Sequence, residues 1–137
     1  MALNFADIKL EIIDARSTST PDIFVNKAFI TFSQGVLDTL QYPPYVQFCM
    51  DPAQRIFAVR PCNSEDIQAT QFSKPHGEQK HSVNIKSRTL LDAARMLIQD
   101  NDATHRYKVT GQYDKENNVM YFEMASAKIA IYRRVGE

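Results

Sequence analysis

The sequence has few or none of several residue types, and each shortage excludes a class of protein. Of its 137 residues, four are glycine, two are cysteine and none is tryptophan. The four glycines do not form the loop that cradles phosphate in nucleotide-binding sites. No apolar run approaches the roughly 18 residues of a membrane span. Positive and negative residues balance at 16 each, which argues against coating nucleic acid through net charge alone.

The N-terminal residues and the two cysteines bear on location. Residues 1–7 lack a basic stretch followed by an apolar one, so no signal peptide is predicted. Cys49 and Cys62 fall on the two arms of one predicted hairpin, and a turn near Ala53 would place residue 57 opposite Cys49. A disulfide is therefore not expected. Two reduced thiols without an export signal indicate the cytoplasm.

Hydrophobic periodicity predicts one α+β domain over residues 1–137 that is rich in β-strand. Eight phenylalanines and six tyrosines suit half-buried pleated surfaces. Alternating or β-branched segments predict strands at 8–12, 29–32, 45–50, 55–60, 69–73, 83–85, 107–113, 119–124 and 128–133.

Two helices are predicted, and a serine stands before each. Ser33 precedes a short helix over residues 34–40, which Pro43 and Pro44 cannot continue. Ser87 precedes a longer helix with apolar residues on one face, namely Leu90, Leu91, Ala94, Leu97 and Ile98. We expect both serines to act as N-caps.

The order of these elements repeats. A β-α-β-β unit over residues 23–62 and a second over 82–124 are predicted to share one core. Residues 63–81 join them, and the segment 125–137 adds a C-terminal strand and tail, opposite an N-terminal strand at 8–12. Capping serines and hairpin aspartates support an internal duplication, although helices often begin with serine and few residues are identical. The first strand of the second unit alternates out of phase by one residue.

The first unit resembles the swapped-hairpin family of DNA-binding proteins, typified by AbrB, SpoVT and MazE. That family runs a strand ending in Ile-Pro into a short helix, then Leu-Gly-hydrophobic, a strand, a turn with Asp and a final strand. Phe32-Ser33, Leu40-Gln41-Tyr42 and Asp51 occupy those places here. Two units in one chain resemble the tandem MraZ regulators. The resemblance implies DNA binding by a dimer.

Four departures from the family pattern weaken the implied activity. The family's Gly-Arg before the first strand falls on Ala28-Phe29, so its DNA-contacting arginine is missing and Lys27 is the nearest basic residue. Ser33 replaces the proline, and Gln41 replaces the glycine. The Asp-x-x-x-Arg signature of the MraZ regulators is absent as well. The resemblance therefore supports the fold more than the activity.

No constellation of residues predicts catalysis or a cofactor. His76 and His81 share a loop with Glu78, but no CxxC or HExxH motif accompanies them, so no metal site is assigned. Cys49 sits in mid-strand, where small apolar residues usually pack. We expect no enzyme, no catalytic residue and no cofactor.

Basic residues gather between the two units and at the start of the second helix. A helix start attracts phosphate, and nearby cations reinforce that attraction. The candidate nucleic-acid-binding residues are Lys27, Lys74, His76, Lys80, His81, Lys86 and Arg88.

Two functions from different classes remain open. The first is a DNA-binding transcription regulator, a homodimer on double-stranded DNA. The second is a protein-interaction or assembly module, for instance of a mobile element, which would expose a large apolar surface and no coherent positive face.

Overall fold

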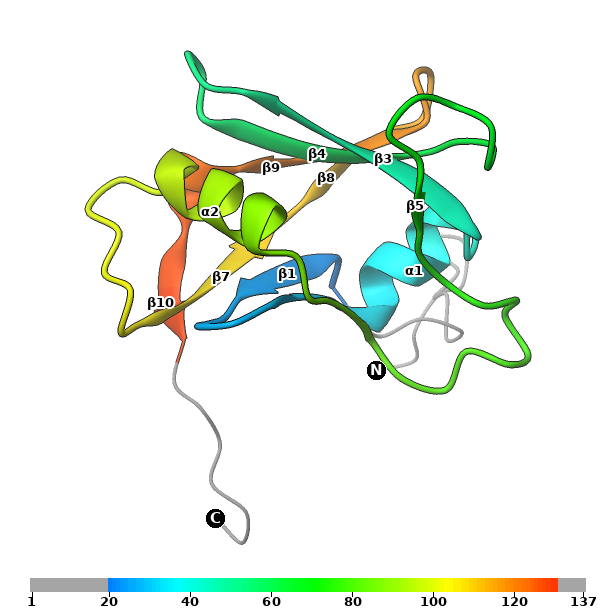
Figure 1. Cartoon of the computed structure of the whole chain (residues 1–137), viewed down its shortest axis with the longest axis horizontal. Helices are drawn as coiled ribbons and strands as arrows, with labels where there is room; N and C mark the ends of the chain where they lie inside the picture. The colour runs from blue at the N-terminus through cyan, green and yellow to red at the C-terminus, as the bar shows by residue number, and fades with distance from the viewer. Residues whose placement is uncertain (1–19, 131–137) are drawn as a thin grey trace, which may run out of the picture.

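The computed structural model describes residues 20–130, which form an α+β fold with two five-stranded antiparallel sheets. Sheet A has the strand order β10-β7-β1-β2-β6, and sheet B has the order β5-β3-β4-β9-β8. The sheets form two layers, with α1 and α2 toward opposite ends of the space between them (Figure 1). The elements are β1 (Asp22–Val25), β2 (Ile30–Phe32), α1 (Gln34–Leu40), β3 (Tyr45–Asp51), β4 (Ile56–Pro61), β5 (Thr70–Gln71), β6 (Val83–Ile85), α2 (Arg88–Leu97), β7 (Arg106–Thr110), β8 (Gln112–Asp114), β9 (Val119–Glu123), a 3-10 turn (Met124–Ser126) and β10 (Lys128–Ala130).

The predicted fold class and order of elements are confirmed. Both units run strand, helix and hairpin: β2-α1-β3-β4 and β6-α2-β7/β8-β9. The predicted strand at 8–12 and the last three residues of the strand at 128–133 lie outside the described residues. One strand was missed, because the apolar stretch from Ile23 to Phe32 contains a hairpin in which Asn26 N–H bonds to Phe29 O.

The two capping serines behave differently. Ser87 Oγ accepts from Leu90 N at 3.2 Å, so this predicted cap is confirmed. Ser33 stands at the N-cap position, but its side chain makes no cap bond. Instead its Oγ accepts from Asp22 N and donates to Thr20 O, both at 2.9 Å. The predicted side-chain cap at Ser33 is therefore wrong, because the start of β1 competes for the same hydroxyl.

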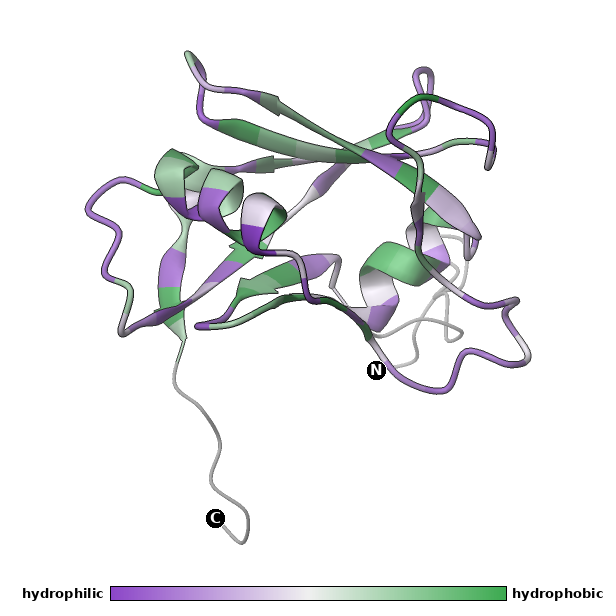
Figure 2. Ribbon diagram, in the orientation of Figure 1, coloured by the Kyte–Doolittle hydropathy of each residue, from purple (hydrophilic) through white to green (hydrophobic). Residues whose placement is uncertain are grey.

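The core lies between the sheets and draws on both units. Directly paired residues of sheet A form inward rows, as in Val109, Ile23, Phe32 and Val83. Phe57 and Phe122 face them from sheet B, and all but one of these side chains are at most 1% exposed. Buried Leu91, Ala94, Leu97 and Ile98 of the second helical stripe complete the core. Figure 2 shows hydrophobic stretches, in green, along the strands and helices, and mostly hydrophilic connecting loops.

The two sheets meet at one corner, where β7 in sheet A continues through Gly111 into β8 in sheet B. Gly111 N–H bonds to Pro21 O at 2.7 Å. A Cβ at this residue would lie 2.6 Å from Phe122 Cε1, so only glycine lets the chain pass so close to the core. The predicted single strand over 107–113 is thus two strands with a bend between them.

The opposite corner is open. β5 pairs with β3 and β6 pairs with β2, but within residues 20–130 no pairing joins β5 to β6. The sheets therefore enclose the core incompletely on this side.

Cys49 lies opposite Ala58 in the β3–β4 register, and both cysteines are free. The expectation that these residues form no disulfide is confirmed. Among residues 20–130 no helix has the length and apolarity that crossing a membrane requires.

Candidate functional site

The predicted basic residues separate into two groups at the two ends of β6. The loop that carries Lys74, His76, Lys80 and His81 leads into the start of β6. Lys86 and Arg88 follow its other end, and the antiparallel pairing of β6 with β2 brings the turn containing Lys27 to that same end. The single cluster expected from the sequence is therefore not formed.

The loop group is organised by neutral contacts. Lys74 N donates to Gln79 Oε1 at 2.8 Å, and Gln79 Nε2 donates to His81 O at 2.6 Å. The His76 ring packs edge-on against Tyr42, with ring centroids 4.8 Å apart. The side chains of Lys74, His76, Lys80 and His81 are all exposed. The bonds within the loop and the contact with Tyr42 of the segment after α1 set their positions.

Tyr42 anchors this loop to α1 through a short hydrogen bond. Its hydroxyl donates to Asp38 Oδ1 at 2.5 Å. Burial, the hydrogen bond to the Asp38 carboxylate and the negative charge of Asp38 together raise the pKa of Tyr42 to about 12. The tyrosine therefore stays protonated at neutral pH and acts as a structural donor.

At the other end of β6, the charge of Arg88 is partly compensated. Its Nε lies 3.2 Å from Asp92 Oδ1, one turn further along α2, and both side chains are largely exposed. Lys86 is exposed and follows β6 directly. It stands two residues after Asn84, which faces outward from β6, and just beyond the end of that strand.

This outward side belongs to a cross-strand row that spans all five strands of sheet A. Lys128 lies opposite Lys108, Lys108 opposite Phe24, Phe24 opposite Thr31, and Thr31 opposite Asn84. Thr31 Oγ1 donates to Asn84 Oδ1 at 2.7 Å, which ties the last two strands of the row together. Lys108, Lys128 and Asn84 are exposed, and Phe24 and Thr31 are half-buried.

The row contains two lysines that directly oppose each other. Like charges at such positions destabilise a sheet. Asp22 offsets part of the repulsion, since its Oδ2 lies 3.8 Å from Lys108 Nζ, but its side chain is only 8% exposed. A ligand approaching from solvent therefore meets the ammonium groups of Lys108 and Lys128 rather than the carboxylate.

An arginine stacked on an aromatic ring extends the same face. The Arg106 guanidinium lies 4.1 Å from the centroid of the Phe24 ring, and Arg106 Nε donates to Asn26 Oδ1 at 2.7 Å. The hydrogen bond and the stacking together fix the plane of the guanidinium. Lys86, Arg106, Lys108 and Lys128 thus give one sheet face four cations beside an aromatic ring; we call these four residues and Phe24 the basic face.

Only Lys86 of the basic face was among the residues predicted from the sequence. One part of the basic face could be read from the sequence. Tyr107 and Val109 are buried, so the residues that alternate with them, Arg106, Lys108 and Thr110, share the outward side of β7. The pairing of β1 with β7 and of β7 with β10 was not readable from the sequence, so Phe24 and Lys128 could not be placed beside them. Tyr107, which stands between Arg106 and Lys108 on β7, is a core residue and 4% exposed.

No protein-family model matches the chain, no curated protein matches it, and no solved structure matches it. The resemblance to the swapped-hairpin family therefore stays a prediction.

Proposed function

We propose that the protein is a non-catalytic, cytoplasmic DNA-binding protein that uses the basic face of sheet A. The observation that carries this proposal is the row in which Lys128, Lys108 and Phe24 stand side by side on three neighbouring strands. Lysines on a sheet contact phosphates, and exposed aromatic or guanidinium planes stack on unpaired bases. The free thiols of Cys49 and Cys62 agree with a reducing compartment.

Single-stranded DNA fits this face better than a duplex. A base can stack only if its π-face is accessible, which requires an unpaired strand, and the Arg106–Phe24 pair offers such a platform. At the start of α2, the basic residue Arg88 is paired with Asp92, so part of its charge is compensated before a phosphate could approach. The family resemblance implies a different mode, in which a dimer binds double-stranded DNA. The experiment must therefore distinguish single-strand binding from duplex binding.

The test measures fluorescence anisotropy of a labelled single strand of about 20 nucleotides and of its duplex at low salt. Three double variants with equal charge change are compared: Lys108→Glu with Lys128→Glu, Lys74→Glu with Lys80→Glu, and Lys86→Glu with Arg88→Glu. We expect the first pair to weaken single-strand binding at least about tenfold, since two phosphate contacts are replaced by repulsion. A further variant, Lys108→Gln with Lys128→Gln, removes both positive charges without placing a new carboxylate beside Asp22. Its plot of the logarithm of the binding constant against the logarithm of the salt concentration should be less steep by about 1.4, the value for two lost phosphate contacts.

Phe24→Leu tests stacking, because it keeps an apolar side chain beneath Arg106 while removing the ring. It should weaken single-strand binding and leave any duplex binding unchanged. Unaltered affinity of the Lys108 and Lys128 variants, with native melting curves, would overturn the proposal. Tighter binding of the duplex that is lost in the Lys74 and Lys80 variant, whose residues lie outside the basic face, would favour the family mode instead.

The alternative function, a protein-interaction module, would require an exposed apolar patch. The exposed large apolar residues of the described chain come from five segments: Met50, Ile67, Met96, Tyr113 and Ile129. The three that lie on strands belong to β3, β8 and β10, and no two of these strands pair with each other. An interaction module would be expected to gather such residues on one patch.

A further inference from the structure

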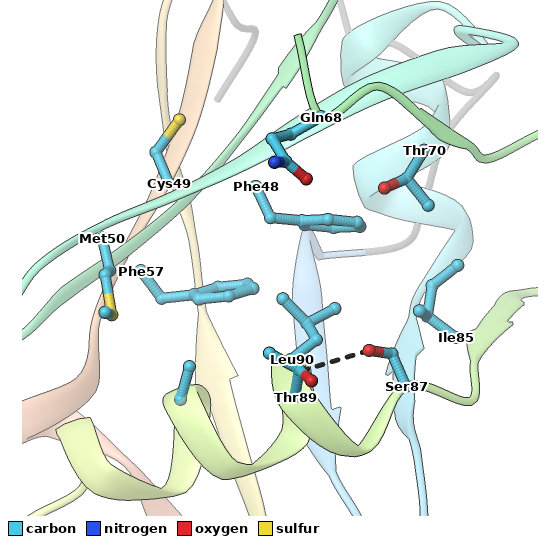
Figure 3. A pocket seen from close by; sticks show the side chains of 11 residues that line it. Phe48, Cys49, Met50, Phe57, Gln68, Thr70, Ile85, Ser87, Thr89 and Leu90 are labelled. Carbon is cyan, nitrogen blue, oxygen red and sulfur yellow. Dashed lines mark hydrogen bonds between the residues drawn. The ribbon is translucent and has the colours of Figure 1, made fainter.

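A pocket of about 520 Å³ occupies the open corner between the sheets. Its walls come from β3 and β4 of sheet B, the segment around β5, the end of β6 and the first turns of α2 (Figure 3). The corner opposite is closed by the continuous path of β7 through Gly111 into β8. The pocket exists because β5 and β6 are not joined in the same way.

One wall of the pocket is apolar and flat. The rings of Phe48 and Phe57 are nearly parallel, with an interplanar angle of 21° and centroids 6.1 Å apart. Phe57 is 1% exposed and belongs to the core, so this wall is rigid. Ile85 and Leu90 face the rings from β6 and α2 (Figure 3). A planar apolar body fits between these surfaces with little loss of side-chain freedom.

Hydrogen-bonding groups stand on two sides of the pocket. Gln68 and Thr70 approach from the β5 side, near the edge of the Phe48 ring (Figure 3). Ser87 lies on the opposite side; its Oγ accepts from Leu90 N, which leaves its proton to donate. Side chains such as these fix the orientation of a bound molecule, whereas the apolar walls supply most of its affinity.

Every residue that lines the pocket is uncharged. A buried ionic group would therefore find no counter-ion, and its desolvation would oppose binding. The volume falls in the range of small-molecule sites, roughly 300–1,000 Å³. We propose that this pocket binds a small, neutral, planar apolar molecule that carries one hydrogen-bonding group. This ligand site is separate from the basic face and does not depend on the proposed DNA binding.

Two probes of nearly equal shape test the polar and apolar parts separately. 2-Naphthol has a planar body and a hydroxyl, and 2-methylnaphthalene replaces the hydroxyl with a methyl group. In NMR titrations of the full chain, both should shift amide signals of β3, β6 and the start of α2. 2-Naphthol should bind about 3–10-fold tighter, the effect of one additional hydrogen bond. Thr70→Val should reduce that preference at least severalfold while 2-methylnaphthalene binds as before.

A matched pair of substitutions on α2 tests the location. Ala93 lines the pocket, and Ala93→Leu should fill part of it and weaken both probes at least about tenfold. Met96 lies on the same helix but is 62% exposed and is not part of the lining, so Met96→Leu should leave both affinities unchanged. Binding that survives Ala93→Leu, equal affinity for the two probes, or no binding of either would overturn the proposal. Thermal melts of each variant establish that the fold is retained.

Discussion

The two halves of the molecule, residues 30–71 and 83–130, use one order of elements and stabilise it differently. Both run strand, helix, hairpin and closing strand, and they pair with each other in both sheets. β2 pairs with β6 through Thr31 opposite Asn84, and β4 pairs with β9 through Ala58 opposite Tyr121. Ala58 and Tyr121 both stand third in the second hairpin arm, since β4 begins at Ile56 and β9 at Val119. Each half therefore pairs with the other through equivalent strands, β2 with β6 and β4 with β9.

The differences lie at the helix ends and in the first arm of each hairpin. α1 ends on a left-handed residue, Gln41, whereas α2 ends on extended Ile98 and is held by buried Arg95. β3 stays in sheet B over seven residues, whereas the matching arm bends at Gly111 and serves both sheets. At the C-terminal ends of the helices, α1 is closed by local backbone conformation at Gln41, whereas α2 is closed by side-chain bonds from Arg95 to distant segments. Four predictions, each with its own control, test these differences between the halves.

The largest loss of stability is expected for Arg95→Met, because Arg95 is 7% exposed and connects three segments. Its Nη2 donates to Asn26 O at 2.7 Å and to His105 O at 3.0 Å, and Nη1 donates to Asn101 Oδ1 at 2.9 Å. Methionine leaves these acceptors without a charged donor, so the free energy of unfolding should fall by about 3 kcal/mol. Urea denaturation measures it. Arg88→Met, which removes only an exposed pair with Asp92, should cost less than about 0.5 kcal/mol. A similar change in both variants would refute the role of Arg95.

Gly111→Ala should have the next largest effect. The new Cβ would lie 2.6 Å from Phe122 Cε1 and 3.0 Å from Met120 Sδ, so core side chains must move, at about 1–3 kcal/mol. Gly77→Ala is the matched control, since a Cβ at residue 77 would have no atom within 4 Å, and it should change stability by less than about 0.5 kcal/mol. In a chain that already carries Phe122→Leu, Gly111→Ala should lower the free energy of unfolding by less than it does in the unmodified chain. Equal effects at the two glycines would mean that the bend tolerates a side chain.

The two serines before the helices provide a third contrast. Ser87→Ala should lower stability by about 1 kcal/mol and speed hydrogen exchange of the Leu90 amide, which Ser87 caps. Ser33→Ala should instead speed exchange of the Asp22 amide, because Ser33 Oγ accepts from Asp22 N and not from α1. Hydrogen exchange measured by NMR distinguishes the two patterns. Faster exchange in the first turn of α1 after Ser33→Ala would show that this serine caps its helix after all.

Periodicity in the sequence predicted most elements but not their partners. Helix 34–40, strand 83–85 and the apolar face of α2 follow from local spacing, which a single segment contains. The bend at Gly111 and the hairpin within 23–32 were missed, because both depend on which strand lies alongside. The phase shift noted in the sequence is real. Thr31, two residues before Ser33, is paired with Asn84 and shares its outward side of sheet A, whereas Ile85, two residues before Ser87, faces the opposite side.

The candidate site shows the same limit. Lys86 was found because it is near a helix start, whereas Lys108 and Lys128 are far apart along the chain and meet only through the β7–β10 register. Charge in a sequence can be counted, but a charged face is created by strand pairing. The loop residues Lys74, His76, Lys80 and His81 were grouped by sequence proximity alone, and the structure keeps them apart from Lys86 at the far end of β6.

The smallest effect, a gain in stability, is expected for Gln41→Gly at the end of α1. Gln41 has φ 62° and ψ 44°, a left-handed conformation that penalises residues with a Cβ, and it stands where the resembled family has glycine. Its backbone N–H still bonds to Asp38 O at 3.2 Å, and its side chain is exposed, so little contact is lost. Glycine should raise the free energy of unfolding by about 0.5–1 kcal/mol in urea denaturation, since relief of strain outweighs the added freedom of the unfolded chain. Gln41→Ala should gain nothing, because alanine keeps the Cβ. A loss of stability with glycine would mean that the Gln41 side chain, rather than the backbone conformation, terminates α1.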